Sequence, residues 1–163
     1  MKKGMKILLF CASALVLISW DRASKELAKE HLKDKAPVSY FHDTFRLQYV
    51  ENTGAALSMG DSLPKAVSFW LLSMLPLAFL LFMSGYAIKH SNEMSKMKLF
   101  AFTLIISGGL GNIYDRIVFD RHVTDFMNMG IGDLRTGIFN FADVCVTAGA
   151  VMMLFSFKKR ANV

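Results

Sequence analysis

Four long apolar stretches dominate the chain. Residues 66–88 carry no charged side chain over 23 residues, and residues 99–114 carry none over 16. Residues 5–20 contain one lysine, and residues 139–157 contain one aspartate. A helix that crosses about 30 Å of hydrocarbon needs about 20 mainly apolar residues. The pattern therefore predicts a mainly α membrane protein with four transmembrane helices, over about residues 5–25, 66–88, 99–118 and 139–157.

Two longer polar segments, residues 26–65 and 119–138, separate these stretches on one side of the predicted bundle. In the first segment, apolar residues alternate with polar ones at positions 45, 47 and 49, which is typical of a strand. Residues 38–41 are predicted to pair with it across a turn, so that a small antiparallel β-sheet forms. The second segment is rich in glycine, which predicts an irregular and mobile loop.

Composition supports membrane insertion, because 53% of the residues are apolar and only 20% are charged. A soluble bundle of four buried helices is the alternative, but almost no charged face would be left to meet water. The first stretch resembles a cleavable signal peptide, yet no small-residue cleavage site follows Trp20. No spacing of Cys, His or Glu typical of a metal or cofactor site occurs, so neither a metal nor a cofactor is expected.

The charges of the predicted loops set the orientation. The side that holds both termini carries nine basic residues and one acidic residue. Lysine and arginine stay cytoplasmic in short loops, so both termini are predicted to be cytoplasmic and the sheet extracytoplasmic. The basic clusters then serve as anchors beside anionic lipid, and the net charge of +6 requires no nucleic-acid partner.

Polar residues gather at the predicted outer ends of the helices. Asp21 and Lys25 are spaced to share one helix face, as are Asn140 and Asp143. Ionisable groups at this depth indicate a functional site inside the bundle. Salt bridges that only stabilise the fold, Asp21 with Lys25 and Asp115 with Arg116, are the competing interpretation.

Two carboxyl groups in one partly dehydrated pocket raise each other's pKa and share a proton. The ionised member can take a proton from water while the protonated member donates to a carbonyl oxygen, which suits peptide hydrolysis. Residue spacing alone does not decide which of Asp115, Asp125 and Asp143 form such a pair.

Five short motifs, in order along the chain, resemble those of the lipoprotein signal peptidases, also called type II signal peptidases. They are Asp21-Arg22-Ala23-Ser24-Lys25, Glu51-Asn52-Thr53-Gly54-Ala55-Ala56, Gly108-Gly109-Leu110-Gly111-Asn112-Ile113-Tyr114-Asp115-Arg116, Val123-Thr124-Asp125-Phe126 and Phe139-Asn140-Phe141-Ala142-Asp143. The sequence departs from the family at Leu57, where an aromatic residue is most common, and at Val144-Cys145, where small hydroxyl residues are common.

The resemblance implies an aspartic endopeptidase of the bacterial cytoplasmic (inner) membrane. It would remove the signal peptide of a diacylglyceryl-modified prolipoprotein, cutting just before the lipid-modified cysteine. By the same resemblance, Asp125 and Asp143 are the catalytic pair and Asp115 is a structural partner of Arg116. Residues 1–163 would form one membrane-embedded peptidase domain that acts as a monomer. The supporting or substrate-binding residues would be Asp21, Lys25, Asn52, Gly54, Gly108, Asn112, Asp115, Arg116, Asn140 and Ala142.

The glycines of the third motif either let helices approach closely or leave room for substrate. The three asparagines of the motifs either orient the carboxyl groups or satisfy backbone groups at helix ends. A second function class is a small proton- or cation-coupled membrane carrier, because carboxylates within a membrane often mark ion paths. A carrier predicts polar groups through the full membrane depth, whereas the inner halves of the predicted helices are almost wholly apolar. A scaffold without enzymatic activity is the third possibility.

Overall fold

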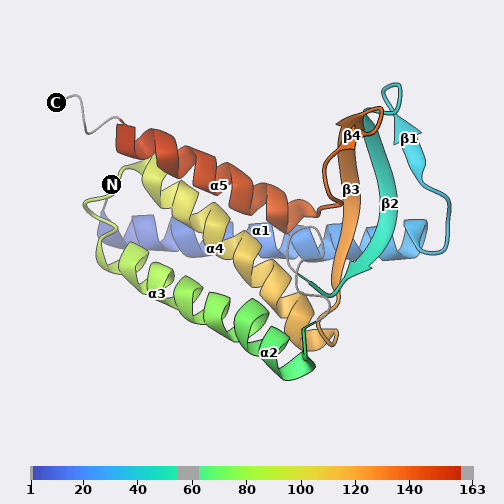
Figure 1. Ribbon diagram of the computed structural model, residues 1–163. Helices are drawn as coiled ribbons and strands as arrows, with labels where there is room; N and C mark the ends of the chain where they lie inside the picture. The colour runs from blue at the N-terminus through green and yellow to red at the C-terminus, as the bar shows by residue number, and fades with distance from the viewer. Residues whose placement is uncertain (1, 55–62, 159–163) are drawn as a thin grey trace.

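The computed structural model describes residues 2–54 and 63–158, which form a helical bundle with a small sheet across one end (Figure 1). The helical elements are α1 (Lys3–Leu32), α2 (Lys65–Phe69), the π-helical turn η2 (Trp70–Met74), α3 (Leu75–Lys89), α4 (Lys96–Val118) and α5 (Phe141–Lys158). The strands are β1 (Val38–Tyr40), β2 (Phe45–Asn52), β3 (Val123–Ile131) and β4 (Leu134–Arg135). The mainly α prediction with a small antiparallel sheet is confirmed.

Three helical segments of the described chain are long and apolar enough to cross a membrane. They are Lys3–Leu32, Lys65–Lys89, which α2, η2 and α3 form together, and Lys96–Val118. The fourth predicted segment is helical as well, but its apolar part, Phe141–Ser156, is shorter than the other three. The chain therefore has the helices of a membrane-protein fold.

The first helix is longer than predicted, because α1 continues through residues 26–32, which were expected to begin the outer loop. Ala28 is buried in this extension, and α1 packs against β2 and β3 of the sheet. The sheet supplies a surface for the end of the helix that a hydropathy pattern does not reveal.

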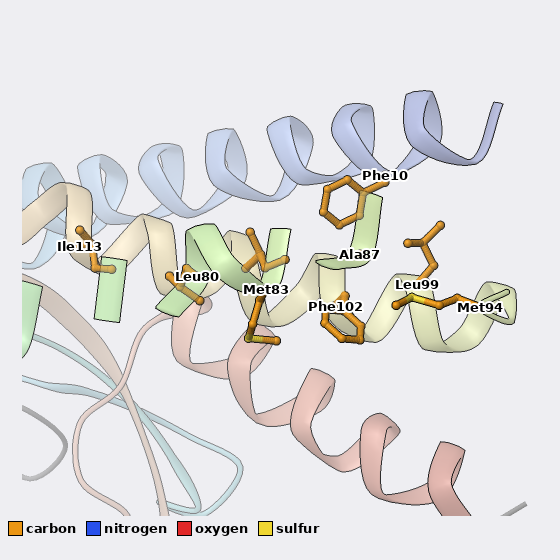
Figure 2. Close-up of a cluster of buried hydrophobic side chains, with 9 residues drawn as sticks. Phe10, Leu80, Met83, Ala87, Met94, Leu99, Phe102 and Ile113 are labelled. Atoms are coloured by element: carbon orange, nitrogen blue, oxygen red, sulfur yellow. The ribbon is translucent and has the colours of Figure 1, made fainter. Parts of the chain in front are cut away.

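Helix α4 lies at the centre of the bundle and packs against α1, α3 and α5. Its side chains Phe102 and Ile106 are buried together with Phe10 of α1 and with Leu80 and Met83 of α3 (Figure 2). Because one helix contacts the three others, its residues fix where the ends of its neighbours lie relative to one another.

The four strands form one antiparallel sheet in the order β1-β2-β3-β4. The predicted hairpin of β1 and β2 is confirmed, with Val38 opposite Leu47. The prediction of an irregular loop over residues 119–138 is wrong, because β3 occupies nine of these residues and pairs with β2 along its length. Glycine marks the turn between β3 and β4, where Gly132 has φ +55°, and does not mark the whole segment as a loop.

Candidate active site

The structure brings Asp125 and Asp143 to one place at the sheet end of the bundle. Asp125 is the third residue of β3, and Asp143 lies in the first turn of α5. Phe139 and Met127 exchange two backbone hydrogen bonds of 2.8 Å, which hold the chain before α5 against β3. This pairing places Asn140 between the two aspartates.

Asparagine side chains connect the two carboxyl groups. Asn140 Nδ2 donates to Asp125 Oδ1 at 2.6 Å and to Asn112 Oδ1 at 3.0 Å. Asn112 Nδ2 in turn donates to Asp143 Oδ1 at 2.8 Å. Asn52 Nδ2, at the end of β2, donates to Asp125 Oδ2 at 3.0 Å. Three of the predicted supporting residues thus contact the aspartates directly.

Asp143 also caps its own helix. Its Oδ2 accepts from the backbone N–H of Asn140 at 2.9 Å, and Asn140 Oδ1 accepts from the backbone N–H of Asp143 at 3.0 Å. This reciprocal arrangement satisfies N–H groups that the first turn of a helix leaves free. The carboxyl group of Asp143 is consequently fixed in position by the helix start itself.

Asp125 is only 3% exposed, and this burial changes the pKa of its carboxyl group. Its pKa is raised to about 6, mainly because burial removes water from the carboxyl group and also because Asp143 lies nearby, while the hydrogen bonds from Asn52 and Asn140 lower it. A carboxyl group with this pKa exchanges a proton near neutral pH.

A buried ion cluster lies beside the pair, between α1 and α4. Lys25 Nζ lies 2.8 Å from Asp21 Oδ2 and 2.8 Å from Asp115 Oδ2, and all three side chains are 1% exposed. Arg22 completes the cluster through an ion pair with Asp115. The predicted Asp21–Lys25 ion pair is present, whereas the predicted pairing of Asp115 with Arg116 is wrong. Asp115 faces α1, which sequence spacing within α4 does not indicate.

The ion cluster is tied to the aspartates by two further contacts. Lys25 Nζ donates to Asn112 Oδ1 at 3.0 Å, and Asp21 Oδ1 accepts from the backbone N–H of Ala142 at 2.9 Å. Asp21 therefore stabilises the positive N-terminal end of α5, close to Asp143. Arg22 was missed by the sequence analysis as a site residue, although it lies inside the first motif.

Arg116 contacts Gly54 of the second motif. Its Nη2 donates to the backbone oxygen of Gly54 at 2.9 Å, and the backbone N–H of Gly54 donates to Asn52 Oδ1 at 2.9 Å. Gly54, Asn52 and Arg116 thereby form one connected wall next to Asp125. Ala55 and Ala56 of the same motif, and the departure at Leu57, lie outside the described residues.

Two glycines of α4 allow close approach of the elements that carry the site. A Cβ atom added to Gly108 would lie 2.3 Å from the backbone oxygen of Ala142 and 2.9 Å from Val146 Cγ2. A Cβ added to Gly111 would lie 2.6 Å from Asp21 Oδ2. Since a Cβ atom at either position would force its neighbour to shift, these contacts set the separation of α4 from α5 and from the ion cluster.

Both aspartates line a cavity of about 1090 Å³ between the sheet and the helices. Asn52, Asn112 and Arg116 are polar groups in its wall, and Leu72, Pro76, Phe79 and Ile105 are among its apolar ones. A mainly apolar cavity with a few converging polar groups is the usual form of a small-ligand or peptide site. Thr136, Gly137 and Ile138 also line it, and no sequence signal indicated their participation, whereas Phe139 belongs to the fifth motif.

Among residues 2–54 and 63–158, no three His, Cys, Asp or Glu side chains are grouped so that they could hold a metal ion. The lining of the cavity includes two carboxyl groups, those of Asp125 and Asp143. Such a site can activate water and protonate a leaving group by acid–base chemistry.

Residues 13–158 match the family model described as signal peptidase (SPase) II. The lipoprotein signal peptidase of Borrelia duttonii (strain Ly) is 32% identical over 91% of this chain and 91% of its own. The lipoprotein signal peptidase of Sulfurihydrogenibium sp. (strain YO3AOP1) is 31% identical over 91% of this chain and 90% of its own. The lipoprotein signal peptidase of Borreliella burgdorferi (strain ZS7) is 34% identical over 94% of this chain and 89% of its own.

The fold is also known from experiment. A bacterial membrane enzyme solved by the in meso method at 2.3 Å resolution superposes with a TM-score of 0.77, covering 98% of this chain and 90% of that one, at 23% identity. A second such structure, at 1.9 Å resolution, gives a TM-score of 0.73 over 94% and 92% of the two chains. The segment that matches the family model, residues 13–158, contains all five motifs and both aspartates, and the chain belongs to the signal peptidase II family.

Proposed function

We propose that Asp125 and Asp143 are the catalytic pair with which this member of the signal peptidase II family cuts prolipoproteins. The family is one of aspartic proteases, and the chain removes the signal peptide from prolipoprotein substrates. The observation that carries the assignment is that these two carboxyl groups share hydrogen bonds with Asn140 and Asn112 in the wall of one cavity. The carrier alternative has no support from the family.

The proposed reaction divides acid and base between the two residues. Asp125, whose pKa is raised to about 6 mainly by burial, is assigned the role of acid, and Asp143 is assigned the role of base. Asp143 takes a proton from water while the water oxygen attacks the peptide carbonyl carbon and Asp125 protonates the carbonyl oxygen. Asp143 then gives its proton to the leaving nitrogen as the C–N bond breaks, and a hydroxyl of the intermediate returns a proton to Asp125.

Arg116, Asn52 and Gly54 are proposed to hold the substrate main chain beside the pair. A second group is proposed to act indirectly, by fixing the position of the first turn of α5 and of the residues that line the cavity. Its members are Asp21, Lys25, Asp115, Gly108 and Ala142. This division follows from the contacts, because the first group lines or adjoins the cavity while the second lies in the ion cluster and the α4–α5 contact.

We further propose that residues 1–163 form one membrane-embedded domain with four spans, both termini cytoplasmic, and the sheet at the outer face. The N-terminus lies at the end of the bundle opposite the sheet (Figure 1). Lys6, Lys89 and Lys96 lie toward that end, as cytoplasmic lysines would. The sheet turns carry the exposed side chains Phe41, Ile131 and Leu134, which suit a lipid surface.

In this arrangement the cavity lies where a membrane-anchored substrate meets the outer interface. A diacylglyceryl-modified cysteine keeps the cleavage point at that depth, so the cut just before this cysteine falls beside the aspartates. One chain holds all the residues of the site, and the enzyme is proposed to act as a monomer in contact with membrane lipid.

The assignment is tested with Asp125→Asn and Asp143→Asn, assayed on a lipid-modified prolipoprotein in detergent. Each variant is expected to lose at least about 100-fold in kcat, because the acid–base pair is removed. Asp120→Asn is the matched control, since this side chain is 70% exposed and pairs with Lys65 away from the cavity. Full activity of either folded variant would contradict the assignment, and inactivity of Asp115→Asn with an active Asp125→Asn would favour an Asp115–Asp143 pair.

A further inference from the structure

The α-helical hydrogen bonding of the second membrane helix is interrupted where the helix passes the cavity. Its first part, α2, ends at Phe69, and α3 begins at Leu75, with the π-helical turn η2 between them. In η2 the backbone N–H of Leu75 donates to the oxygen of Trp70, five residues earlier. In an α-helix the same N–H would donate to Leu71. The carbonyl of Leu71 therefore loses its α-helical donor.

Pro76 removes a second donor immediately afterwards. Proline has no backbone N–H, so the carbonyl of Leu72 has no donor at the position four residues later. Two successive carbonyl groups, those of Leu71 and Leu72, thus lack their α-helical partners at one point of an uncharged helix. π-Helical turns of this kind occur frequently at functional sites.

This interrupted stretch, residues 71–76, which we call the opened turn, faces the site. Leu72 and Pro76 both line the cavity that contains Asp125 and Asp143. Ser68 in α2 and Ser73 in η2 are 1% and 0% exposed, and within the described part of the chain their hydroxyl oxygens have no hydrogen-bond partner. Irregular backbone within a membrane protein is tolerated where it lines a cavity, because the freed groups need a partner there.

The substrate brings the complementary groups. To be cut, the peptide must be extended at the cleavage point, so the end of the signal helix has to unwind. Each unwound residue exposes a backbone N–H, which is costly in an apolar cavity unless an acceptor is present. A main-chain carbonyl is such an acceptor, and it tolerates any substrate side chain.

We propose that the opened turn at residues 71–76 binds the unwound main chain of the signal peptide, with the Leu72 carbonyl accepting a hydrogen bond from a substrate N–H. Pro76 is a positioning residue in this arrangement, because it has no N–H group that could pair with the Leu72 carbonyl. The inference rests on the proposed peptidase function and adds to it a substrate-binding element on the cavity wall formed by the second helix.

Pro76→Ala tests the role of the free carbonyl, since alanine supplies the missing N–H within the helix. We expect kcat/KM for a lipid-modified prolipoprotein peptide to fall about 3- to 10-fold, mainly through KM, as for the loss of one hydrogen bond. Pro64→Ala, at the start of the same helical segment and outside the cavity lining, is the control and is expected to stay within about 2-fold of the wild type.

A substrate series separates a direct hydrogen bond from a change in helix shape. In each peptide of the series, one amide N–H before the lipid-modified cysteine is replaced by an ester oxygen. With the wild type, one position is expected to lower kcat/KM about 3- to 10-fold, and with Pro76→Ala the same replacement is expected to have no further effect. If no ester replacement weakens cleavage by the wild type, or if both enzymes lose the same activity, the inference is overturned while the proposed function stands. Absence of wild-type cleavage would overturn the proposed function as well.

Discussion

A carboxyl group inside an apolar cavity is stable only where its hydrogen-bond donors are fixed. Asn52 and Asn140 provide such donors to Asp125, and Asn112 provides one to Asp143. Each asparagine comes from a different element, so the carboxyl groups keep their positions only while β2, α4 and the start of α5 stay together. At the scale of single residues, the site depends on amide side chains as much as on the aspartates.

The first prediction concerns the pH dependence of stability at Asp125. Its pKa is raised from 3.8 to about 6 in the folded chain, so the folded state binds a proton more tightly than the unfolded state. The contribution is fully present below about pH 4 and is lost as the pH rises through about 6, with a size on the order of 2–3 kcal/mol.

Thermal unfolding in detergent between pH 4 and pH 8 measures this effect. The melting temperature of Asp125→Asn minus that of the wild type is expected to increase as the pH rises from 4 to 7. Asp133→Asn, in the exposed turn between β3 and β4, controls for a general response to pH. A difference that is independent of pH would contradict the raised pKa.

The second prediction concerns Lys25, the common partner of two buried carboxylates. Lys25→Met leaves Asp21 and Asp115 without this partner and is expected to destabilise the fold by about 3–5 kcal/mol. Lys29→Met, on an exposed position one turn further along α1, is expected to change stability by less than about 1 kcal/mol. Unfolding midpoints in detergent compare the two, and an unchanged midpoint for Lys25→Met would contradict the prediction.

At the scale of elements, the contact between α4 and α5 decides where Asp143 lies. This contact is made by small residues, with Gly108 of α4 against the backbone of Ala142 in α5. A short distance between the helices is what lets Asn112 on α4 reach Asp143 on α5. The third prediction follows from this distance.

Gly108→Ala would place a methyl group 2.3 Å from the Ala142 oxygen and must push α5 away from α4. We expect a loss of stability of about 1–3 kcal/mol and a larger proportional loss of kcat than of substrate binding. Gly85→Ala in α3 is the matched control, because its added Cβ meets nothing within 4 Å. Unchanged cleavage by Gly108→Ala would show that the helix separation is not critical.

The element scale also explains why the predicted loop over residues 119–138 was wrong. Residues 119–138 contain several glycines and read as a loop, yet β3 is the strand that carries Asp125. A strand is stabilised by its neighbours, and β3 gains backbone partners from β2, from β4 and from Phe139. The longest of these pairings is with β2, which is distant in sequence, so local composition does not report it.

At the scale of the whole molecule, the two ends of the bundle differ in chemistry. The end near the N-terminus is basic, and Lys6 Nζ donates there to the backbone oxygens of Ser91, Asn92 and Met94 at 2.8–3.0 Å. The other end carries the sheet (Figure 1), with Asp125 in β3 and Asp143 in the first turn of α5. The proposed orientation in the membrane follows from this difference.

The fourth prediction tests that orientation by cysteine labelling in cells. After replacement of Cys11 and Cys145 by serine, Asp133→Cys at the sheet and Asn92→Cys in the α3–α4 connection are each introduced. An impermeant maleimide is expected to label the first in cells with a permeable outer barrier and an intact inner membrane, and the second only after that membrane is disrupted. The reverse result would place the site on the cytoplasmic side.

The sequence by itself determined the helical segments, the first hairpin and the family. Long uncharged stretches fold as helices in lipid because backbone groups must be satisfied locally, and this requirement can be read from composition. The five motifs also contain both aspartates and the three polar residues Asn52, Asn112 and Arg116 of the cavity wall, whereas much of its apolar lining lies outside them. These features depend on neighbours in sequence or on matched positions.

The tertiary structure alone decided which acidic groups meet. Asp115, Asp125 and Asp143 are equivalent candidates by spacing, but α4 turns Asp115 toward Lys25 and Arg22 of α1. Asp125 and Asp143 instead share the Asn140–Asn112 hydrogen bonds and one cavity. The physical reason is that periodicity fixes the face of a helix on which a side chain lies, whereas its partner depends on which faces pack together.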